Sequence, residues 1–357
     1  MTDALLEGLK RIARTKGHAA IYVANGHGAW EAALRNTVKP GERVLLVSTG
    51  FFSHRWGEVA DDLGLAVTEI THGMGEAADP ELLEAALRAD SCHEIRAVMA
   101  VQTETSSSVC NDVSALRAAM SRARHPALFI VDCIASLGCD RYEMDDWGVD
   151  VTVAAGQKGL MNPIGLSFVM FNDKAMVARK AVRPGRYWDW TDRAFSRSFY
   201  PRWCGSPPAH HMFALRETLG MILDEEGLEA AWRRHSTFAR AVWAAVEAWG
   251  RTGLMALNIS DRTRRASGVT TVNTTPGVAA RIRAWCEAEA GVTLGNALGF
   301  PPEETADHFR IGHMGHLNVH MLMGTLGSIE TAMVAEGLDF GPGALTAAAH
   351  ALAAHRP

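Results

Sequence analysis

The chain has 357 residues, of which 48% are hydrophobic and 21% charged, which is ordinary globular composition with ample material for a buried core. Its formal net charge is −5 and its charges are spread rather than blocked, which argues against nucleic acid or an anionic membrane as a partner. No apolar run approaches the roughly 18 residues of a membrane span, and the opening residues lack the apolar stretch of a signal peptide. We therefore expect a cytoplasmic, two-domain protein with a small-molecule partner.

Seven short apolar runs rich in β-branched residues predict buried strands, and segments with helical periodicity lie between them. The predicted strands are 20–24, 43–48, 65–70, 96–101, 127–132, 149–154 and 165–171. The predicted helices among them include 54–63, 80–87 and 113–124. This alternation is typical of an α/β fold with a largely parallel sheet covered by helices. Functional groups in such folds gather at the ends of the strands.

The second half of the chain has a different pattern. Residues 209–249 carry a long helical stripe, which predicts a bridging helical region. Beyond it the sequence predicts a strand at 268–273, a helix at 277–290 and two final helices around 322–336 and 345–355. We expect a large domain of residues 1–250, which includes the bridging helices, and a smaller α+β domain of residues 251–357. The six cysteines are scattered without CxxC or Cys/His spacing, which predicts reduced thiols rather than disulfides or a metal site.

A glycine-containing turn follows the first predicted strand. Asn25-Gly26-His27-Gly28 leads directly into a strong helix-forming run at 29–34. The free backbone N–H groups and the dipole of such a helix start favour a phosphate. The alternative interpretation is that Asn25 only caps the helix while the glycines ease the turn.

Two further residues lie at predicted strand ends. Asp132 ends the run 127–131, where its carboxylate can bind a protonated ring nitrogen or cap the next turn. Lys158 follows the strand 149–154 and is flanked by Gly156 and Gly159. Partial desolvation there lowers the pKa of a lysine and frees its amine for Schiff-base chemistry, whereas a loop lysine in solvent has no such property. The order of phosphate turn, strand-end aspartate and glycine-flanked lysine on one sheet favours a cofactor site.

Three segments, VDCIASLG at 131–138, DWGVD at 146–150 and GQKG at 156–159, resemble the class V aminotransferases, which are pyridoxal phosphate (PLP) enzymes of fold type I. The closest resemblance is to the alanine-glyoxylate, serine-glyoxylate and aspartate-glyoxylate branch, over essentially the whole chain. It implies that Lys158 holds PLP and that the enzyme moves an amino group, by a ping-pong mechanism, from a small amino acid (alanine, serine or aspartate) to a 2-oxo acid such as glyoxylate or pyruvate. It also implies a homodimer with phosphate contacts across the interface.

The same resemblance implies roles for individual residues around the cofactor. They are Gly26 and His27 in the phosphate cup with Asn25 beside them, Phe52 stacked on the pyridine ring, Thr105 near the ring O3′, Asp132 on the ring nitrogen, Ile134 on the other ring face, and Gln157 against the phosphate or the ring. Arg310, in the segment Arg310-Ile311-Gly312, matches the arginine that holds the substrate α-carboxylate, a task that suits a planar fork.

Trp203 and Ser206 match a segment that reaches the phosphate of the neighbouring subunit. Serine keeps the hydroxyl of the threonine usual there, whereas tryptophan offers only an indole N–H in place of a phenol. The aromatic-rich segment 187–200 is predicted to be a loop that packs at the subunit interface or at the substrate mouth. The alternative is that its aromatic side chains have a purely structural role.

Two other functions remain open at this point. A cysteine desulfurase or related PLP lyase needs a mobile nucleophilic cysteine, and Cys286 is the candidate, although its helical surroundings suit a core thiol. A nucleotide-dependent oxidoreductase would use the glycine turn, but GxGxxG is lacking there.

The resemblance carries one more implication. Its members have, ahead of the first helix of this chain, a glycine-proline segment that encloses the substrate carboxylate. Either Met1 is an internal start or this protein has lost the segment; in both cases we expect the 357-residue form to bind PLP but to turn over slowly.

Overall fold

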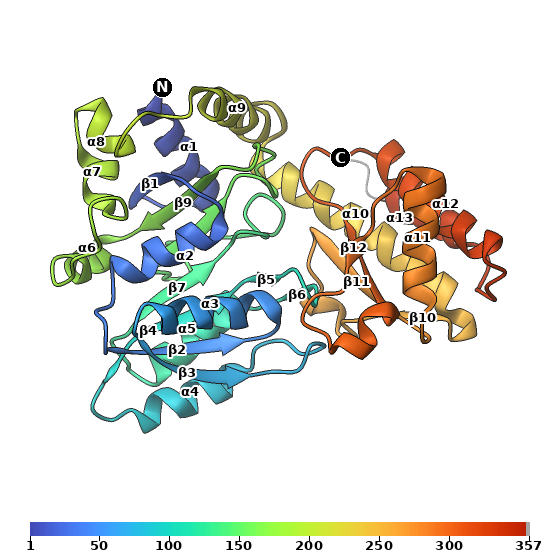
Figure 1. Ribbon diagram of the computed structural model, residues 1–357, viewed down its shortest axis with the longest axis horizontal. Coiled ribbons are helices and arrows are strands. Elements are labelled where there is room, and N and C mark those ends of the chain that lie inside the picture. Colours follow the sequence, from blue (N-terminus) through green and yellow to red (C-terminus); the bar gives the residue numbers. More distant parts are fainter. Residues whose placement is uncertain (355–357) are drawn as a thin grey trace.

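The computed structural model describes residues 1–354, which build a large and a smaller sheet with their covering helices, together with one short two-stranded hairpin (Figure 1). The larger sheet has seven strands in the order β1-β9-β8-β7-β4-β2-β3. Their bounds are β1 (His18–Val23), β2 (Arg43–Ser48), β3 (Ala66–Thr71), β4 (Ile95–Val101), β7 (Leu128–Asp132), β8 (Val151–Ala155) and β9 (Leu166–Phe171). Strand β9 runs antiparallel to both of its neighbours, and the remaining pairs are parallel. All seven predicted strands are confirmed, with ends that differ by at most two residues.

Successive residues of the central strands pack into two separate hydrophobic clusters, one on each face of the large sheet. Phe129 and Val131 of β7 belong to the first cluster, whereas Leu128 and Ile130 belong to the second. This alternation follows from the period of two in a strand. The first face is covered by α1 (Thr2–Ala13), α4 (Pro80–Ala89) and α5 (Val113–Arg122), and the second by α2 (Gly26–Arg35), α3 (Phe51–Asp62) and α6 (Asp173–Arg179). The predicted helices at 54–63, 80–87 and 113–124 correspond to α3, α4 and α5.

The predicted bridging region consists of α9 (Ala209–Gly220), a π-helical turn (Met221–Glu226) and α10 (Leu228–Trp249). Helix α10 packs on both sheets, because Leu228 and Ala231 join the first cluster of the large sheet while its residues from Phe238 onward pack in the core of the smaller sheet. The hydrophobic core therefore changes within α10. The proposed division of the chain at residue 250 stays a prediction.

The smaller sheet is antiparallel, with the order β10-β11-β13-β12. Its strands are β10 (Met255–Leu257), β11 (Val269–Thr274), β12 (Gly295–Asn296) and β13 (His308–Gly312), and its helices are α11 (Val278–Ala290), α12 (Val319–Ala335) and α13 (Ala344–Ala353). The predicted strand 268–273 and helix 277–290 are confirmed as β11 and α11. The predicted helices 322–336 and 345–355 correspond to α12 and α13, and residue 355 lies outside the described residues. Strands β10 and β12 are too short to leave an alternating pattern.

The segment 187–200, predicted as a loop, instead contains α7 (Trp190–Phe195), and α8 (Phe199–Trp203) begins at its end. Two local features explain the correction. The Asp189 side chain caps α7 by accepting from the backbone N–H of Thr191. Trp190 is fully buried and stacks on Phe171 of β9 at a centroid distance of 4.2 Å. A short hairpin of β5 (Thr103–Glu104) and β6 (Val109–Cys110) follows β4.

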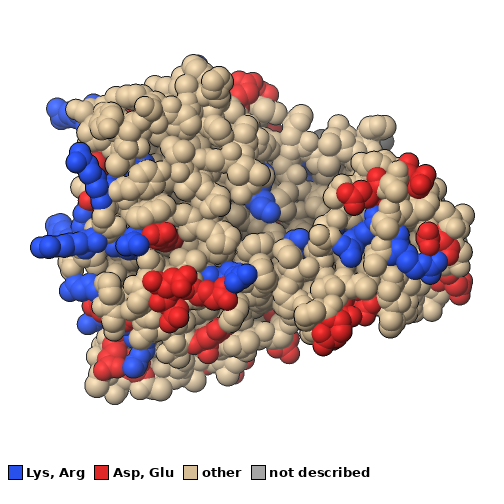
Figure 2. Space-filling view, viewed as in Figure 1, with Lys and Arg blue, Asp and Glu red and all other residues tan. Residues whose placement is uncertain are grey.

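The six cysteines all carry free thiols. Within residues 1–354, no helix has both the length and the apolar character needed to cross a bilayer. Acidic and basic side chains are interspersed on the face drawn in Figure 2, in agreement with the spread of charge along the sequence.

Candidate active site

The turn after β1 contains the residue that caps α2, and it also leaves backbone N–H groups of the first helical turn unpaired within the helix. The Asn25 side chain accepts a hydrogen bond of 3.3 Å from the N–H of Gly28, so it caps α2. The N–H groups of Gly26 and His27 lie in the first turn, where no partner within the helix exists, and both residues line a cavity. A Cβ atom at Gly26 would come within 2.6 Å of Cδ1 of Ile134, so a larger residue at this position would require the Ile134 side chain to shift. The capping and phosphate-binding interpretations are therefore compatible.

Asp132 ends β7 with its carboxylate at the floor of the same cavity and is only 3% exposed. Oδ1 accepts a 2.6 Å hydrogen bond from the N–H of Ile134, and Oδ2 accepts one of 2.6 Å from the indole Nε1 of Trp30. Burial raises the pKa of Asp132 to about 7, although the two hydrogen bonds oppose this shift. The carboxylate is thus fixed in orientation and still has lone pairs free for a third donor.

Lys158 lies three residues after the end of β8, the strand that pairs with β7, and its side chain lines the cavity. Burial lowers the pKa of Lys158, and the nearby positive charge of Arg310 lowers it further. Both effects increase the share of neutral amine, which is the nucleophilic form. The adjacent Gln157 has a buried Oε1 atom with no hydrogen-bond partner among the described residues. This oxygen can therefore accept a hydrogen bond from a ligand bound next to Lys158.

Phe52 provides an aromatic wall, and a buried carboxylate fixes its position. Its backbone N–H and that of Ser53 point to the carboxylate of Glu104, at 3.3 and 2.9 Å. Glu104 also accepts from the backbone N–H and the hydroxyl of Ser106, at 3.2 and 2.8 Å. Helix α3 therefore begins on a negatively charged side chain, which its dipole favours.

Nine of the predicted cofactor residues line one cavity of about 290 Å³. They are Asn25, Gly26, His27, Phe52, Thr105, Asp132, Ile134, Gln157 and Lys158. The fold thus brings together residues from five separate stretches of the chain at the carboxyl ends of parallel strands, as α/β sheets do.

Arg310, on β13 of the smaller sheet, lies beside this cavity without lining it. Its guanidinium donates to the carbonyl of Thr105 at 3.0 Å and to the carbonyl of Asn296 at 2.7 Å. Burial lowers the pKa of Arg310, an effect that the charge of Glu104 opposes. A cation held by two carbonyls at the edge of the cavity has further N–H groups available for a carboxylate.

The structure does not bring Trp203 or Ser206 to the cavity. Trp203 is 2% exposed and packs in the core of its own chain, where its indole N–H points to Thr2 Oγ1 at 3.4 Å. The indole N–H of Trp203 thus has an acceptor within its own chain, and its contact with the phosphate of a second subunit stays a prediction. Ser206 is exposed, so a contact from its hydroxyl to another subunit stays a prediction.

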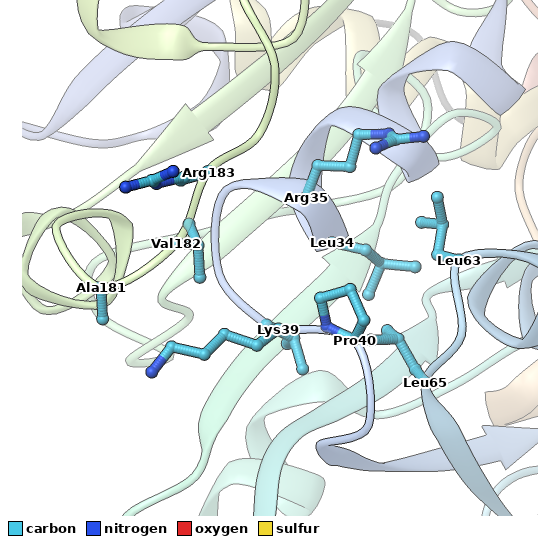
Figure 3. A pocket seen from close by; sticks show the side chains of 10 residues that line it. Leu34, Arg35, Lys39, Pro40, Leu63, Leu65, Ala181, Val182 and Arg183 are labelled. Carbon is cyan, nitrogen blue, oxygen red and sulfur yellow. The ribbon is translucent and has the colours of Figure 1, made fainter.

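A second cavity, of about 430 Å³, lies between the end of α2 and residues 181–183 (Figure 3). Its walls are mainly aliphatic, and its three basic side chains are Arg35, Lys39 and Arg183. Figure 3 shows that Arg35 extends to the opposite side of the view from Lys39 and Arg183, and Arg35 is paired with Glu31 at 2.6 Å. They therefore do not form a common anion site.

Comparisons with known proteins agree with this geometry. The sequence signature of "Aminotransferase class-V" matches residues 9–299. The chain is 35% identical to serine--glyoxylate aminotransferase of Methylorubrum extorquens, over 100% of this chain and 89% of that protein, and 36% identical to L-aspartate--glyoxylate aminotransferase of Paracoccus denitrificans, over 98% and 87%. This chain belongs to the class V aminotransferase family. Among solved structures, ureidoglycine-glyoxylate aminotransferase from Bacillus subtilis is similar, with a TM-score of 0.86 and 26% identity over 98% of this chain and 89% of that chain.

Class V aminotransferases use pyridoxal phosphate and share PLP fold type I, so the expected fold, cofactor and enzyme class are confirmed. The cavity fits that cofactor. Free N–H groups at the start of α2 suit the phosphate, the Asp132 carboxylate suits a protonated ring nitrogen, and the unpartnered Gln157 Oε1 accepts a donor. The nucleotide-dependent oxidoreductase alternative is thereby excluded.

The cavity also has lining residues that were not predicted from the sequence, namely Trp30, Val101, Thr103, Ala135 and Ile164, and Glu104, which holds the backbone of Phe52, was not predicted either. Trp30 lies one helical turn after His27, and that spacing was the available signal that it shares a face with the cup. Glu104 directly precedes the predicted residue Thr105 in the sequence. A buried acidic residue is not distinguishable from an exposed one by sequence alone.

Proposed function

We propose that this aminotransferase moves the amino group of a small amino acid, such as serine, alanine or aspartate, to glyoxylate or pyruvate by a ping-pong mechanism. The observation that carries the proposal is the common cavity of Lys158, Asp132 and the open start of α2, at the ends of two adjacent parallel strands. The names of the relatives from Methylorubrum extorquens and Paracoccus denitrificans support the glyoxylate branch.

The residues that line the cavity have different proposed roles in binding PLP. Bound PLP supplies an electron sink for the charge that develops on the substrate α-carbon. The N–H groups of Gly26 and His27 would bind the phosphate, and Phe52 and Ile134, which line the same cavity, would hold the ring. Asp132 holds a proton at the ring nitrogen, which favours the uptake of negative charge by the ring.

Lys158 and Arg310 act on the substrate. The amine Nζ of Lys158 would act as the base that takes the proton from the substrate α-carbon, a task that its lowered pKa favours. The guanidinium of Arg310 binds the α-carboxylate and so orients the α-carbon toward Lys158. Amino acid and 2-oxo acid both carry that carboxylate, so one arginine serves both half-reactions.

We further propose that the active unit is a homodimer. Ile164 lines the cavity and yet is 69% exposed, so this side of the cavity is open to solvent in the single chain. Large exposed apolar side chains occur in the nearby sequence segments, namely Phe195, Phe199, Tyr200 and Phe213. A second copy that covers these residues would bury apolar surface and bring Ser206 toward the neighbouring cavity.

The test is a matrix of amino donors and 2-oxo acid acceptors with the PLP-loaded protein. We expect glyoxylate or pyruvate to be aminated by at least one of serine, alanine and aspartate. The Lys158→Ala variant should lose the cofactor absorbance that borohydride bleaches, together with turnover. Absence of transfer from all donors, or normal turnover in the variant, would overturn the proposal.

A cysteine desulfurase activity finds no support in the described residues around Cys286. This thiol is fully buried within α11 in the core of the smaller sheet, and burial raises its pKa to about 11. A catalytic cysteine needs an accessible thiolate. Cys286 is therefore a core residue, as its helical pattern predicted.

A further inference from the structure

The loop Thr105–Ser108, between β5 and β6, connects the cavity to the smaller sheet. Thr105 lines the cavity, and its carbonyl accepts from the guanidinium of Arg310 on β13. The next carbonyl, that of Ser106, accepts a 3.0 Å hydrogen bond from the hydroxyl of Thr271 on β11. The loop therefore contacts both strands of the smaller sheet that face it.

Ser108 has an unusual backbone in this loop. Its φ angle is +63°, the left-handed region that residues with a Cβ atom rarely adopt. The residue is only 4% exposed. Strain of this kind persists where the surrounding structure requires it, and it is concentrated at functional sites.

The hydrogen bonds of the Ser108 hydroxyl explain why the surrounding structure keeps this residue in the left-handed conformation. It accepts a 2.9 Å hydrogen bond from the backbone N–H of Thr271 and donates to the carbonyl of Ser107 at 2.6 Å. A second contact joins the same elements, because the Ser108 carbonyl accepts from the N–H of Ala266 at 3.0 Å. Ser108 thus binds the smaller sheet through its side chain and its backbone.

Among the described residues, the backbone N–H of Thr271 has no acceptor in the smaller sheet on the side of β11 that faces β10. Its carbonyl accepts from the N–H of Asn258, just past the end of β10. In a strand the N–H and the carbonyl of one residue point to the same side, so the N–H of Thr271 also faces the region that β10 no longer reaches. Thr271 is fully buried, so water cannot replace the Ser108 hydroxyl.

The register of the smaller sheet connects this contact to the substrate site. Thr271 pairs directly with Arg310, the residue that approaches the cavity. Ser108 therefore holds the strand position opposite Arg310, while Thr105 in the same loop holds the guanidinium itself.

We propose that Ser108 is a positioning residue, whose left-handed backbone and hydroxyl hold β11, and through it Arg310, in place at the edge of the cavity. The proposal rests on the function proposed above, in which Arg310 binds the substrate carboxylate. Ser108 itself does not contact the cavity, so its effect is expected on substrate binding rather than on cofactor binding.

Two substitutions separate the hydroxyl from the backbone. Ser108→Ala removes the hydroxyl and keeps the strain, whereas Ser108→Gly removes both. Arg124→Gly is the matched control, because Arg124 is also left-handed, with φ of +53°, but is exposed and lies before β7 at the far end of the strand from Asp132.

Both Ser108 variants should raise the KM for amino acid and for 2-oxo acid together, by roughly tenfold, which is the size of the loss of one hydrogen bond. The value of kcat and the absorbance of bound cofactor should change little. Hydrogen exchange of the peptide that contains Thr271 should become faster in both variants, and Arg124→Gly should change none of these quantities.

A wild-type KM in Ser108→Gly would overturn the proposal, and so would a raised KM without faster exchange around Thr271. The exchange measurement needs no turnover. If the wild-type enzyme transfers no amino group, the function proposed above fails, while unchanged exchange in the Ser108 variants would refute the contact itself.

Discussion

The indole N–H of Trp30 donates a 2.6 Å hydrogen bond to Oδ2 of Asp132, so helix α2 contacts the end of β7 directly beneath the cavity. Trp30 is 1% exposed and packs between two other rings, with centroid distances of 4.4 Å to His27 and 5.9 Å to Trp56. The helix whose start can bind phosphate is therefore the same helix that orients the carboxylate. The two ends of a bound cofactor are coupled through α2.

Trp30→Phe should slow the reaction while leaving the cofactor bound. Loss of a hydrogen bond to a charged group costs about 1.5–3 kcal/mol. Because this hydrogen bond lowers the pKa of Asp132, its removal should raise that pKa further and shift the acidic limb of the pH–rate profile to higher pH. Measurement of half-reaction rates between pH 6 and 9 checks this.

Trp56→Phe is the control for that experiment. The indole Nε1 of Trp56 is buried and has no hydrogen-bond partner within residues 1–354, so this change replaces an indole of the same ring cluster without removing a hydrogen bond. We expect its pH–rate profile to match that of the wild type. Equal shifts in both variants would mean that ring packing, and not the hydrogen bond to Asp132, sets the rate.

The strands were predictable because burial on both faces leaves continuous apolar runs in the sequence. All residues of β7, β8 and β9 are buried, and their sequences are accordingly apolar over nearly their whole length. Asp132 and Lys158 were predictable for a related reason, because each interrupts or follows such a run at a strand end. The other predicted residues of the cavity were identified through the resemblance to the class V aminotransferases, and their convergence on one cavity depends on the parallel topology, which the βαβ alternation indicates.

Contacts between distant segments were not predictable in the same way. The Trp30 to Asp132 hydrogen bond joins residues 102 positions apart, and nothing in either neighbourhood specifies the other. The burial of Trp203 depends on the packing of α8 against α1, and neither segment specifies that packing by itself. The sequence around α7 does not predict a helix, because α7 is only six residues long and is stabilised by the packing of Trp190 in the core.

Arg310→Lys should raise the KM for amino acids and for 2-oxo acids together. Lysine lacks the planar fork, so it cannot bind the Thr105 and Asn296 carbonyls and a carboxylate at the same time. A loss of roughly 2 kcal/mol, or about 30-fold in KM, is expected for a bidentate charged contact. Steady-state kinetics for both substrates measure it, and an unchanged KM for either substrate would place the carboxylate site elsewhere.

Two buried histidines should make the protein less stable in mild acid. His235 accepts at Nε2 from the N–H of Gly315 and donates from Nδ1 to the Ala231 carbonyl, so it is held neutral. Burial lowers its pKa to about 4 and that of His313 to about 3. The unfolded chain, with ordinary histidine pKa values near 6.5, therefore binds more protons than the folded protein below that pH, and stability falls as pH falls.

At pH 5 the loss at His235 is on the order of 2 kcal/mol relative to pH 7.5. The raised pKa of Asp132 makes the protein more stable as the pH falls, which opposes the effect of His235. We therefore compare the pH-dependent change in the free energy of unfolding of the wild type with that of His235→Gln, because Asp132 contributes equally to both. Urea unfolding at both pH values measures it. The variant should lose less stability between pH 7.5 and 5 than the wild type, and parallel losses would show that His235 does not contribute.

Glu104→Gln should destabilise the protein and loosen the aromatic wall of the cavity. The Glu104 carboxylate is fully buried, and its Oε1 and Oε2 accept from the N–H groups of Phe52 and Ser53 respectively. A glutamine offers one oxygen and turns an NH₂ group toward the other donor, so a buried N–H is left without a partner, at a cost of about 1–3 kcal/mol. Loss of a negative charge at the start of α3 adds about 0.5 kcal/mol.

The free energy of unfolding and the affinity for PLP measure the two effects separately. Glu58→Gln is a control on the same helix, because Glu58 is exposed and pairs with Arg55 on the surface, where a single charge contributes little. We expect Glu104→Gln to lower the free energy of unfolding and weaken PLP binding, because Phe52 is held by its backbone N–H to that carboxylate. If PLP binds Glu104→Gln as tightly as the wild type, Phe52 keeps its position without Glu104, and the cofactor wall is then fixed by the packing of α3 alone.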